Sequence, residues 1–290
     1  MTTTTKSKTV SAILPNYNYA HFFCSRLQEI LSQTYQVSEI IILDDNSTDK
    51  SREIILPEIA KLQAMRPDIA VKHCFNRQNS GNVFSQWQKG IELSSAEYIW
   101  ICELDDSAKP KFLETVMAPF KDDNVVLSFC NSKMINQKGE LIIKDNLRKI
   151  KDFFRRRHVL GEYVVDGLTE INRSLAVFNS IPNVSATIIK NQSSLTTFLE
   201  EAKKYRLCGD WYFYLKVAAA GKIAYTNKTL NLHRIHSDSV TKKTALKERF
   251  AETKSIHKFA RNTFKLQNNT IRRMEKIEIE LAKKWKIKDN

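Results

Sequence analysis

Three acidic residues directly follow an apolar stretch near the middle of the chain. Tyr98–Cys102 has the length and composition of a buried strand, and Glu103, Leu104, Asp105 and Asp106 come next. A central strand delivers the residues that follow it to the carboxyl edge of its sheet, where open α/β sheets bind ligands. Carboxylates there suit Mg²⁺ or Mn²⁺, which bind carboxylate oxygens together with substrate phosphate oxygens. Glu103 and Asp105 could therefore share one ion; alternatively, the acids simply open the next helix.

The first hundred residues alternate between strand-like and helix-like patterns. Short β-prone runs occupy 10–14, 39–43, 71–75 and 98–102, and apolar residues recur at helical spacing over 20–32, up to Met65, and over 83–93. Pro57 is expected to kink or split the second of these helices. Strands that alternate with helices in this way predict an α/β fold with a mostly parallel, helix-covered sheet.

The second half of the chain is less regular. Strand-like runs occupy 125–129, 185–189 and 223–226, a helix is expected from Trp211, and 233–239 reads as a polar loop. The last fifty residues hold 15 Lys or Arg against 6 Asp or Glu, a net +9, within a total of +14. Their apolar residues fall in a helix-compatible pattern, which predicts either a membrane-surface or partner element or an ordinary helix packed on the domain.

Composition limits the class of protein. The chain has 290 residues, 42% of them apolar, which is ample for a core. The polar start predicts that there is no signal peptide, and no run reaches the length of a membrane span. The five cysteines are scattered without a C-x-x-C pair, which argues against disulfides or a zinc site and favours a reducing cytosol.

Four motifs in order resemble those of family-2 glycosyltransferases. They are Val10–Asn18 (VSAILPNYN), Leu43–Asp49 (LDDNSTD), Glu97–Asp106 (EYIWICELDD) and Gly209-Asp210. The resemblance runs from about Val10 to Thr241. It implies a GT-A fold and an inverting, nucleotide-diphospho-sugar-dependent enzyme, with a nucleotide-sugar-binding half over 8–107, an acceptor-binding half over 108–241 and a basic helical tail over 242–290.

The resemblance also assigns the nucleotide end of the donor site. In the family, the proline-bearing loop after the first strand and the second acid of the Asp-Asp turn hold the nucleobase. Pro15 and Tyr17 would therefore line the nucleobase site, and Asp45 would accept a hydrogen bond from a uracil or thymine N–H. Helix capping is the alternative for the acidic cluster, with Asn46, Ser47 or Thr48 available as caps.

The family's D-x-D motif corresponds here to Glu103-Leu104-Asp105. By resemblance, Asp105 would ligate Mg²⁺ or Mn²⁺ bridging the donor diphosphate, and Glu103 would face the ribose or the metal. Glutamate replaces the commoner first aspartate, which leaves the division of roles between the two acids open. The loop Asn79–Asn82 also fits, but Gln86-Trp87-Gln88-Lys89 replaces the Arg-Asn that follows it in the family, so the role of that arginine is unassigned.

Asp210 matches the family's general base, with Gly209 where glutamate is common. A single displacement needs such a base, because the acceptor hydroxyl must lose its proton as it attacks the anomeric carbon. The alternative role for Asp210 is the N-cap of the Trp211 helix. The segment 233–239 resembles the late R-x-H loop that closes over the donor, so Arg234 would contact the diphosphate and His236 the metal or a phosphate.

The resulting expectation is a metal-dependent transferase that moves a sugar from a UDP- or dTDP-sugar to a glycan or glycolipid hydroxyl in bacterial surface polysaccharide synthesis. Its location would be cytoplasmic, with a possible peripheral contact to an anionic membrane surface. One rival is a sugar-nucleotide nucleotidyltransferase, which would need a phosphate cradle, and the segment after the first strand has no glycine. The other is a basic nucleic-acid-binding protein, for which the chain shows no aromatic or zinc pattern.

Overall fold

The computed structural model describes residues 8–143, 161–181, 183–235 and 246–286. Their strands form one mixed sheet in the order β3-β2-β1-β4-β9-β6-β10-β5, with β7 paired to β6 and β8 paired to β10. The strands are β1 (Val10–Asn16), β2 (Glu39–Asp44), β3 (Ala70–Phe75), β4 (Tyr98–Ile101), β5 (Ser107–Ala108), β6 (Val125–Ile135), β7 (Leu141–Ile143), β8 (Tyr163–Asp166), β9 (Thr187–Lys190) and β10 (Lys222–Arg234).

The first half follows the predicted alternation. Strands β1, β2, β3 and β4 pair in parallel, and the helices between them are α1 (Ala20–Leu31), α2 (Ser51–Met65) and α3 (Val83–Leu93). The expected split of α2 is wrong, because the helix continues through Pro57. Burial of Ile55, Ile59 and Leu62 on the same helix offsets the hydrogen bond that proline cannot donate.

The second half brings an antiparallel strand into the centre of the sheet. Strand β9 pairs antiparallel with both β4 and β6, whereas β6 and β10 are parallel. The remaining elements before the tail are α4 (Phe112–Met117), η1 (Ala118–Lys121), α6 (Gly167–Glu170), the π-helical turn η3 (Ile171–Leu175), the 3-10 turn η4 (Val184–Ala186), α7 (Ser194–Ala202) and α8 (Gly209–Ala218). Strand β10 is longer than predicted and contains His233 and Arg234, so the expectation of a loop at these two residues is wrong.

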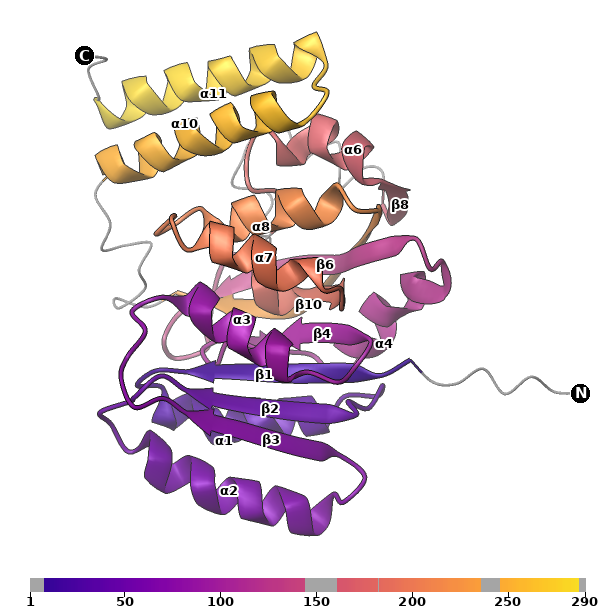
Figure 1. Ribbon diagram of the computed structural model, residues 1–290, viewed down its shortest axis with the longest axis vertical. Helices are drawn as coiled ribbons and strands as arrows, with labels where there is room; N and C mark the ends of the chain where they lie inside the picture. Colours follow the sequence, from indigo (N-terminus) through magenta and orange to yellow (C-terminus); the bar gives the residue numbers. More distant parts are fainter. Residues whose placement is uncertain (1–7, 144–160, 182, 236–245, 287–290) are drawn as a thin grey trace, which may run out of the picture.

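Helices cover both faces of the sheet, as Figure 1 shows. Successive residues of β1 point to opposite faces. Ile13 packs with α3 and α8, whereas Ala12 and Leu14 pack with α1 and α2. Close approach of α3 to β1 requires glycine at position 90, since a Cβ there would overlap the Ile13 side chain. The result is a three-layer α/β fold, in agreement with the sequence prediction.

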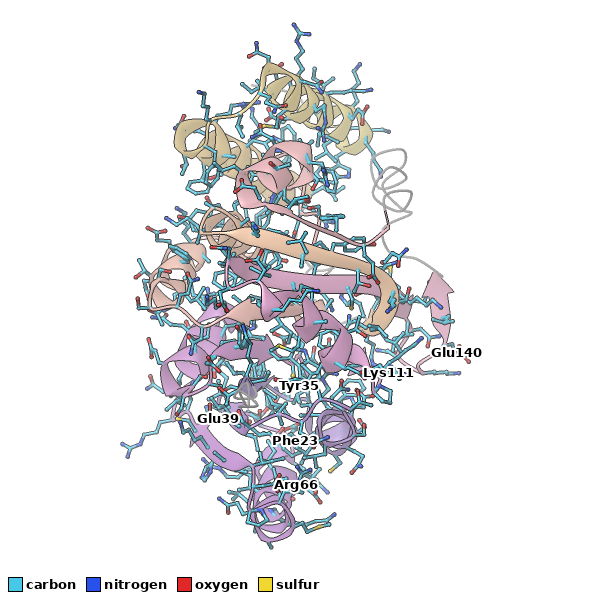
Figure 2. All side chains as sticks on the ribbon, turned by 90° about the vertical axis from the view of Figure 1, so that its right-hand side faces the viewer. Phe23, Tyr35, Glu39, Arg66, Lys111 and Glu140 are labelled. Atoms are coloured by element: carbon cyan, nitrogen blue, oxygen red, sulfur yellow. The ribbon has the colours of Figure 1, made fainter. Side chains whose placement is uncertain are left out.

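The tail forms a helical hairpin of α10 (Leu246–Thr263) and α11 (Asn268–Trp285) at one end of the molecule, visible in both Figure 1 and Figure 2. Ile256, Ala260 and Met274 are fully buried and belong to the same core cluster as α8. His257 is also buried, with its ring nitrogens 2.6 Å from Glu278 Oε1 and 3.0 Å from the Val177 carbonyl oxygen. The hairpin therefore packs on the domain, as one of the two interpretations predicts. Within the described residues no helix has the length and apolar content needed to cross a membrane.

Candidate active site

The acidic turn lies at the end of β4, between two strands of the sheet. Strand β5 follows directly at Ser107, and α4 begins only at Phe112, with Lys111 in the N-cap position and no capping side chain. The alternative that these acids open the next helix is therefore wrong. Leu104 is buried beneath the turn, which leaves its acidic neighbours to face the carboxyl edge of the sheet.

Glu103 is held from two sides. Trp87 of α3 donates from Nε1 to Glu103 Oε1 at 2.7 Å, and the Glu103 backbone N–H donates to Ser185 Oγ at 3.1 Å. Burial and, after it, the charge of Asp105 raise the pKa of Glu103 to about 8, and the Trp87 hydrogen bond opposes the shift. Two carboxylates that repel each other in this way fit a site for a shared cation.

Asp106 is buried, and its carboxylate forms hydrogen bonds with other parts of the protein. Its carboxylate accepts from Asn183 Nδ2 at 2.5 Å and from the Arg234 backbone N–H at 3.1 Å. Burial raises the pKa of Asp106, and the charge of His233 opposes that shift. Asp106 therefore acts mainly to fix the turn on β10.

The Arg234 guanidinium is bound to main-chain carbonyls. It donates from Nε to the Asp105 carbonyl at 2.8 Å, and from Nη1 to those of Asn136 and Gln137 at 2.9 and 3.1 Å. These bonds hold the acidic turn against the end of β6. A contact between Arg234 and a diphosphate stays a prediction, and His236 lies outside the described residues.

Asp210 lies in the first turn of α8, inside the helix. The N-cap position is Cys208, so the alternative that Asp210 is the cap is wrong. Its carboxylate accepts from the Trp211 N–H at 2.7 Å and from Asn179 Nδ2 at 2.9 Å. Burial raises the pKa of Asp210 to about 6. Gly209 allows this turn to pack on α3, because a Cβ there would overlap the Phe84 ring.

One short stretch of chain, Asn179–Ser185, joins Asp210 to the acidic turn. Asn179 donates to Asp210, Asn183 donates to Asp106, and Ser185 accepts from Glu103. A second link is the buried Tyr214 of α8, whose pKa is raised by burial and then by the charges of Asp210, Glu103 and Asp106. The structure thus links the predicted base to the acidic turn, which is about a hundred residues away in sequence.

The residues predicted to bind the nucleotide of the donor lie at the carboxyl ends of β1 and β2. Pro15 belongs to β1 and pairs in register with Leu43, so its placement in the following loop is wrong. Tyr17 follows the strand and is 48% exposed. The proposed caps Asn46, Ser47 and Thr48 do not cap α2; Asp49 instead accepts from the Ser51 N–H at 2.9 Å.

Asp45 is buried and accepts hydrogen bonds from several protein donors. Asn76 Nδ2 lies at 2.6 Å, Ser80 Oγ at 2.7 Å and Gln86 Nε2 at 2.8 Å, and the Ser80 N–H also donates. The carboxylate therefore fastens the loop between β3 and α3. A nucleobase N–H would have to share these oxygens, and that contact stays a prediction.

Sequence reasoning missed the polar partners of the predicted acids. Those partners are Gln86, Trp87, Asn179, Asn183 and Ser185. A signal existed for the first two, since they belong to the stretch Gln86–Lys89, which replaces the Arg-Asn of the family. Metal ligation also needs oxygens from elsewhere: in the described ranges no group of three or more His, Cys, Asp or Glu side chains could hold an ion.

Proteins from bacteria are similar to this chain in sequence. An uncharacterised glycosyltransferase of Nostoc sp. is 26% identical over 228 residues, which cover 78% of this chain and 65% of that protein. The glycosyltransferase GlyG of Streptococcus pneumoniae is 35% identical over 123 residues, which cover 42% of this chain and 38% of that protein. The chain thus spans less than two thirds of the length of these relatives.

Solved structures show the same fold. The S. aureus protein TarS, residues 1–349, aligns with a TM-score of 0.63 at 15% identity, over 95% of this chain and 73% of TarS. The mannosyltransferase PcManGT of Pyrobaculum calidifontis, solved with GDP-Man and Mn²⁺, aligns with a TM-score of 0.62 at 15% identity, over 96% of this chain and 71% of that one. The family described as Glycosyl transferase family 2 matches residues 11–171, more than half of the chain, which therefore belongs to this family.

Proposed function

We propose that this glycosyltransferase moves a sugar, with inversion, from a UDP- or dTDP-sugar to a hydroxyl of a glycan or glycolipid acceptor in bacterial surface polysaccharide synthesis. The observation that carries the proposal is the stretch Asn179–Ser185, which links the predicted base to Glu103 and Asp106 of the acidic turn. Family membership favours this activity over a nucleotidyltransferase or a nucleic-acid-binding protein.

Asp210 is the proposed general base. The acceptor oxygen would form a bond to the anomeric carbon while the bond from that carbon to the diphosphate oxygen breaks. The hydroxyl proton would pass to the Asp210 carboxylate, and the electron pair of the broken bond would leave on the diphosphate. A pKa of about 6 suits this role, because the carboxylate is ionised at neutral pH and still basic. One displacement inverts the anomeric configuration.

Mg²⁺ or Mn²⁺ is the proposed cofactor, held by Asp105 and Glu103 with His236 as a further ligand. The residues fit a cation, because burial and then the charge of Asp105 raise the pKa of the Glu103 carboxyl, and a cation beside both would offset that shift. When bound, the ion would neutralise the charge of the leaving diphosphate. TarS has been solved with UDP-GlcNAc and PcManGT with Mn²⁺, which supports a nucleotide sugar and a divalent metal here.

The remaining donor contacts are proposed for Pro15, Tyr17, Asp45 and Arg234. The first three surround the carboxyl ends of β1 and β2, and Arg234 lies beside the acidic turn. With these contacts, the donor would extend along the edge of the sheet. Its nucleobase would lie over β1 and β2, and its diphosphate would lie at the end of β4.

A screen of sugar nucleotides against thermal unfolding tests the proposal. We expect one donor to raise the melting temperature only with Mg²⁺ or Mn²⁺, because a ligand that binds only the folded state stabilises that state by mass action. Incubation of that donor with candidate glycans, followed by mass spectrometry, should then show one added sugar residue. Stabilisation by oligonucleotides and by no sugar nucleotide would contradict the proposal.

The basic hairpin is the proposed contact to an anionic membrane surface from the cytoplasmic side. Lys276, Lys283 and Lys284 are exposed on α11, and each basic residue near an anionic surface contributes about 1 kcal/mol. We expect the protein to float with anionic vesicles and the triple Lys→Glu variant to stay in solution. Charge reversal is a cleaner test than truncation after Thr241, which would remove core residues such as Ile256. Equal flotation of both proteins would exclude these lysines.

A further inference from the structure

A carboxylate from the hairpin binds the loop that precedes α8. Glu252 of α10 accepts hydrogen bonds from three consecutive backbone N–H groups. The N–H of Arg206 donates to Oε1 at 2.7 Å, and those of Leu207 and Cys208 donate to Oε2 at 2.9 and 2.8 Å. Because one carboxylate accepts hydrogen bonds from three successive main-chain N–H groups, it fixes the path of the loop at 206–208.

The bound loop ends where α8 begins. Cys208 is the N-cap residue of α8 and contributes no side-chain cap, and Asp210 lies two residues later. Main-chain donors at a helix start need partners, which a capping side chain usually provides. The Cys208 N–H has its partner on a helix more than forty residues further along the chain, and the other two donors to Glu252 belong to the loop before α8.

Helix α10 is itself firmly held. Phe250 is 6% exposed and Ile256 is fully buried, on either side of Glu252. His257 stacks edge-on against Trp211, the neighbour of Asp210, with 5.6 Å between ring centroids. Movement of α10 would therefore be transmitted to the first turn of α8.

We propose that Glu252 is a positioning residue for Asp210, so that the C-terminal hairpin is part of the catalytic apparatus. This inference rests on the proposed role of Asp210 as the base. Glu252 would set the distance and direction of the Asp210 carboxylate toward the acceptor hydroxyl, without touching substrate itself.

The charge of Glu252 provides a second readout. Cys208, Tyr214 and Glu252 are titratable groups that interact with Asp210. Burial raises the pKa values of Cys208 and Tyr214 far above neutral, so both side chains stay uncharged. Glu252 is thus the negative charge that, after burial, helps to raise the pKa of Asp210.

The test compares Glu252→Gln with Glu248→Gln. Glu248 lies one turn earlier on α10 and forms an ion pair with the exposed Arg206 side chain at 3.7 Å, so Glu248→Gln is a matched change of charge. We expect Glu252→Gln to lower kcat about tenfold or more, because a small misplacement of a reacting group has effects of this size. Donor affinity should persist, and the acid limb of the pH–rate profile should move to lower pH. Glu248→Gln should match wild type in all three.

Glu252→Asp keeps the negative charge but has a shorter side chain, so it is the variant to test if Glu252→Gln does not fold. It should lower kcat while the acid limb stays at the wild-type pH. The inference would be overturned if Glu252→Gln had the wild-type kcat and an unmoved acid limb. If the glutamine variant is unfolded, wild-type kcat in Glu252→Asp would overturn it instead. An active Asp210→Asn variant would instead refute the role of Asp210 on which the inference rests.

Discussion

We expect Asp210→Asn to lower the rate of sugar transfer by on the order of a hundredfold or more, the usual contribution of a positioned general base. Asparagine has nearly the same shape and can still accept from the Trp211 N–H, but it cannot take up the acceptor proton. Donor affinity should be close to that of wild type, since the carboxylate belongs to the acceptor side of the site. Turnover and donor calorimetry on the purified variant measure the two effects separately.

Stability and pH dependence provide the control for Asp210→Asn. The folded-state pKa of Asp210, about 6, lies above its ordinary value of 3.8. Its contribution to stability is therefore complete below the ordinary value and is lost as pH rises through about 6. The asparagine variant should melt at the wild-type temperature or above it at neutral pH. Wild-type transfer should decline below about pH 6, where the base becomes protonated.

Wild-type-like transfer by Asp210→Asn would contradict the assignment of the base. The next acids to test would then be Glu200 and Glu201. Glu200 is paired with Lys203 at 2.6 Å, and Glu201 accepts from the Tyr212 hydroxyl at 2.6 Å.

We expect Asp105→Asn to weaken metal-dependent binding of the donor by at least about tenfold, because an acid that ligates a hard cation contributes charge as well as an oxygen. Without a cation, the negative charge of Asp105 would repel the diphosphate. Calorimetry with the identified donor, with and without ethylenediaminetetraacetic acid, measures this effect. Asp123→Asn is the control, since that carboxylate is exposed and pairs with Lys8 at 2.9 Å. Undiminished donor affinity in the chelator would refute the metal site.

The first half of the fold could be predicted because its signals are local. Strands β2 and β4 contain unbroken buried apolar runs, the run of β1 is interrupted by Ser11, and the helices between the strands repeat apolar residues with helical period. Parallel strands then place their carboxyl ends together, which is why the acidic turn and Asp45 could be assigned to one edge of the sheet. Pro57 misled the prediction, because tertiary burial of α2 outweighed its intrinsic cost.

The partners of the acids could not be predicted, because they depend on non-local packing. Asn179, Asn183 and Ser185 meet the acids only because β9 runs antiparallel and begins at the edge where β4 ends. Nothing in a short apolar run states the direction of a strand. The role of Glu252 could not be predicted for the same reason. In the sequence it resembles any solvated glutamate on a charged helix, and only the fold places the loop at 206–208 against it.

The position of β9 also affects how the protein folds during synthesis. Strand β4 pairs with β1 on one side, and its other side stays open until Ile189 and Lys190 have been made. An apolar strand with an unpaired edge is a template for association with other chains. The nascent N-terminal half therefore carries an exposed, aggregation-prone edge for as long as the next ninety or so residues take to emerge, a period in which chaperones would be needed.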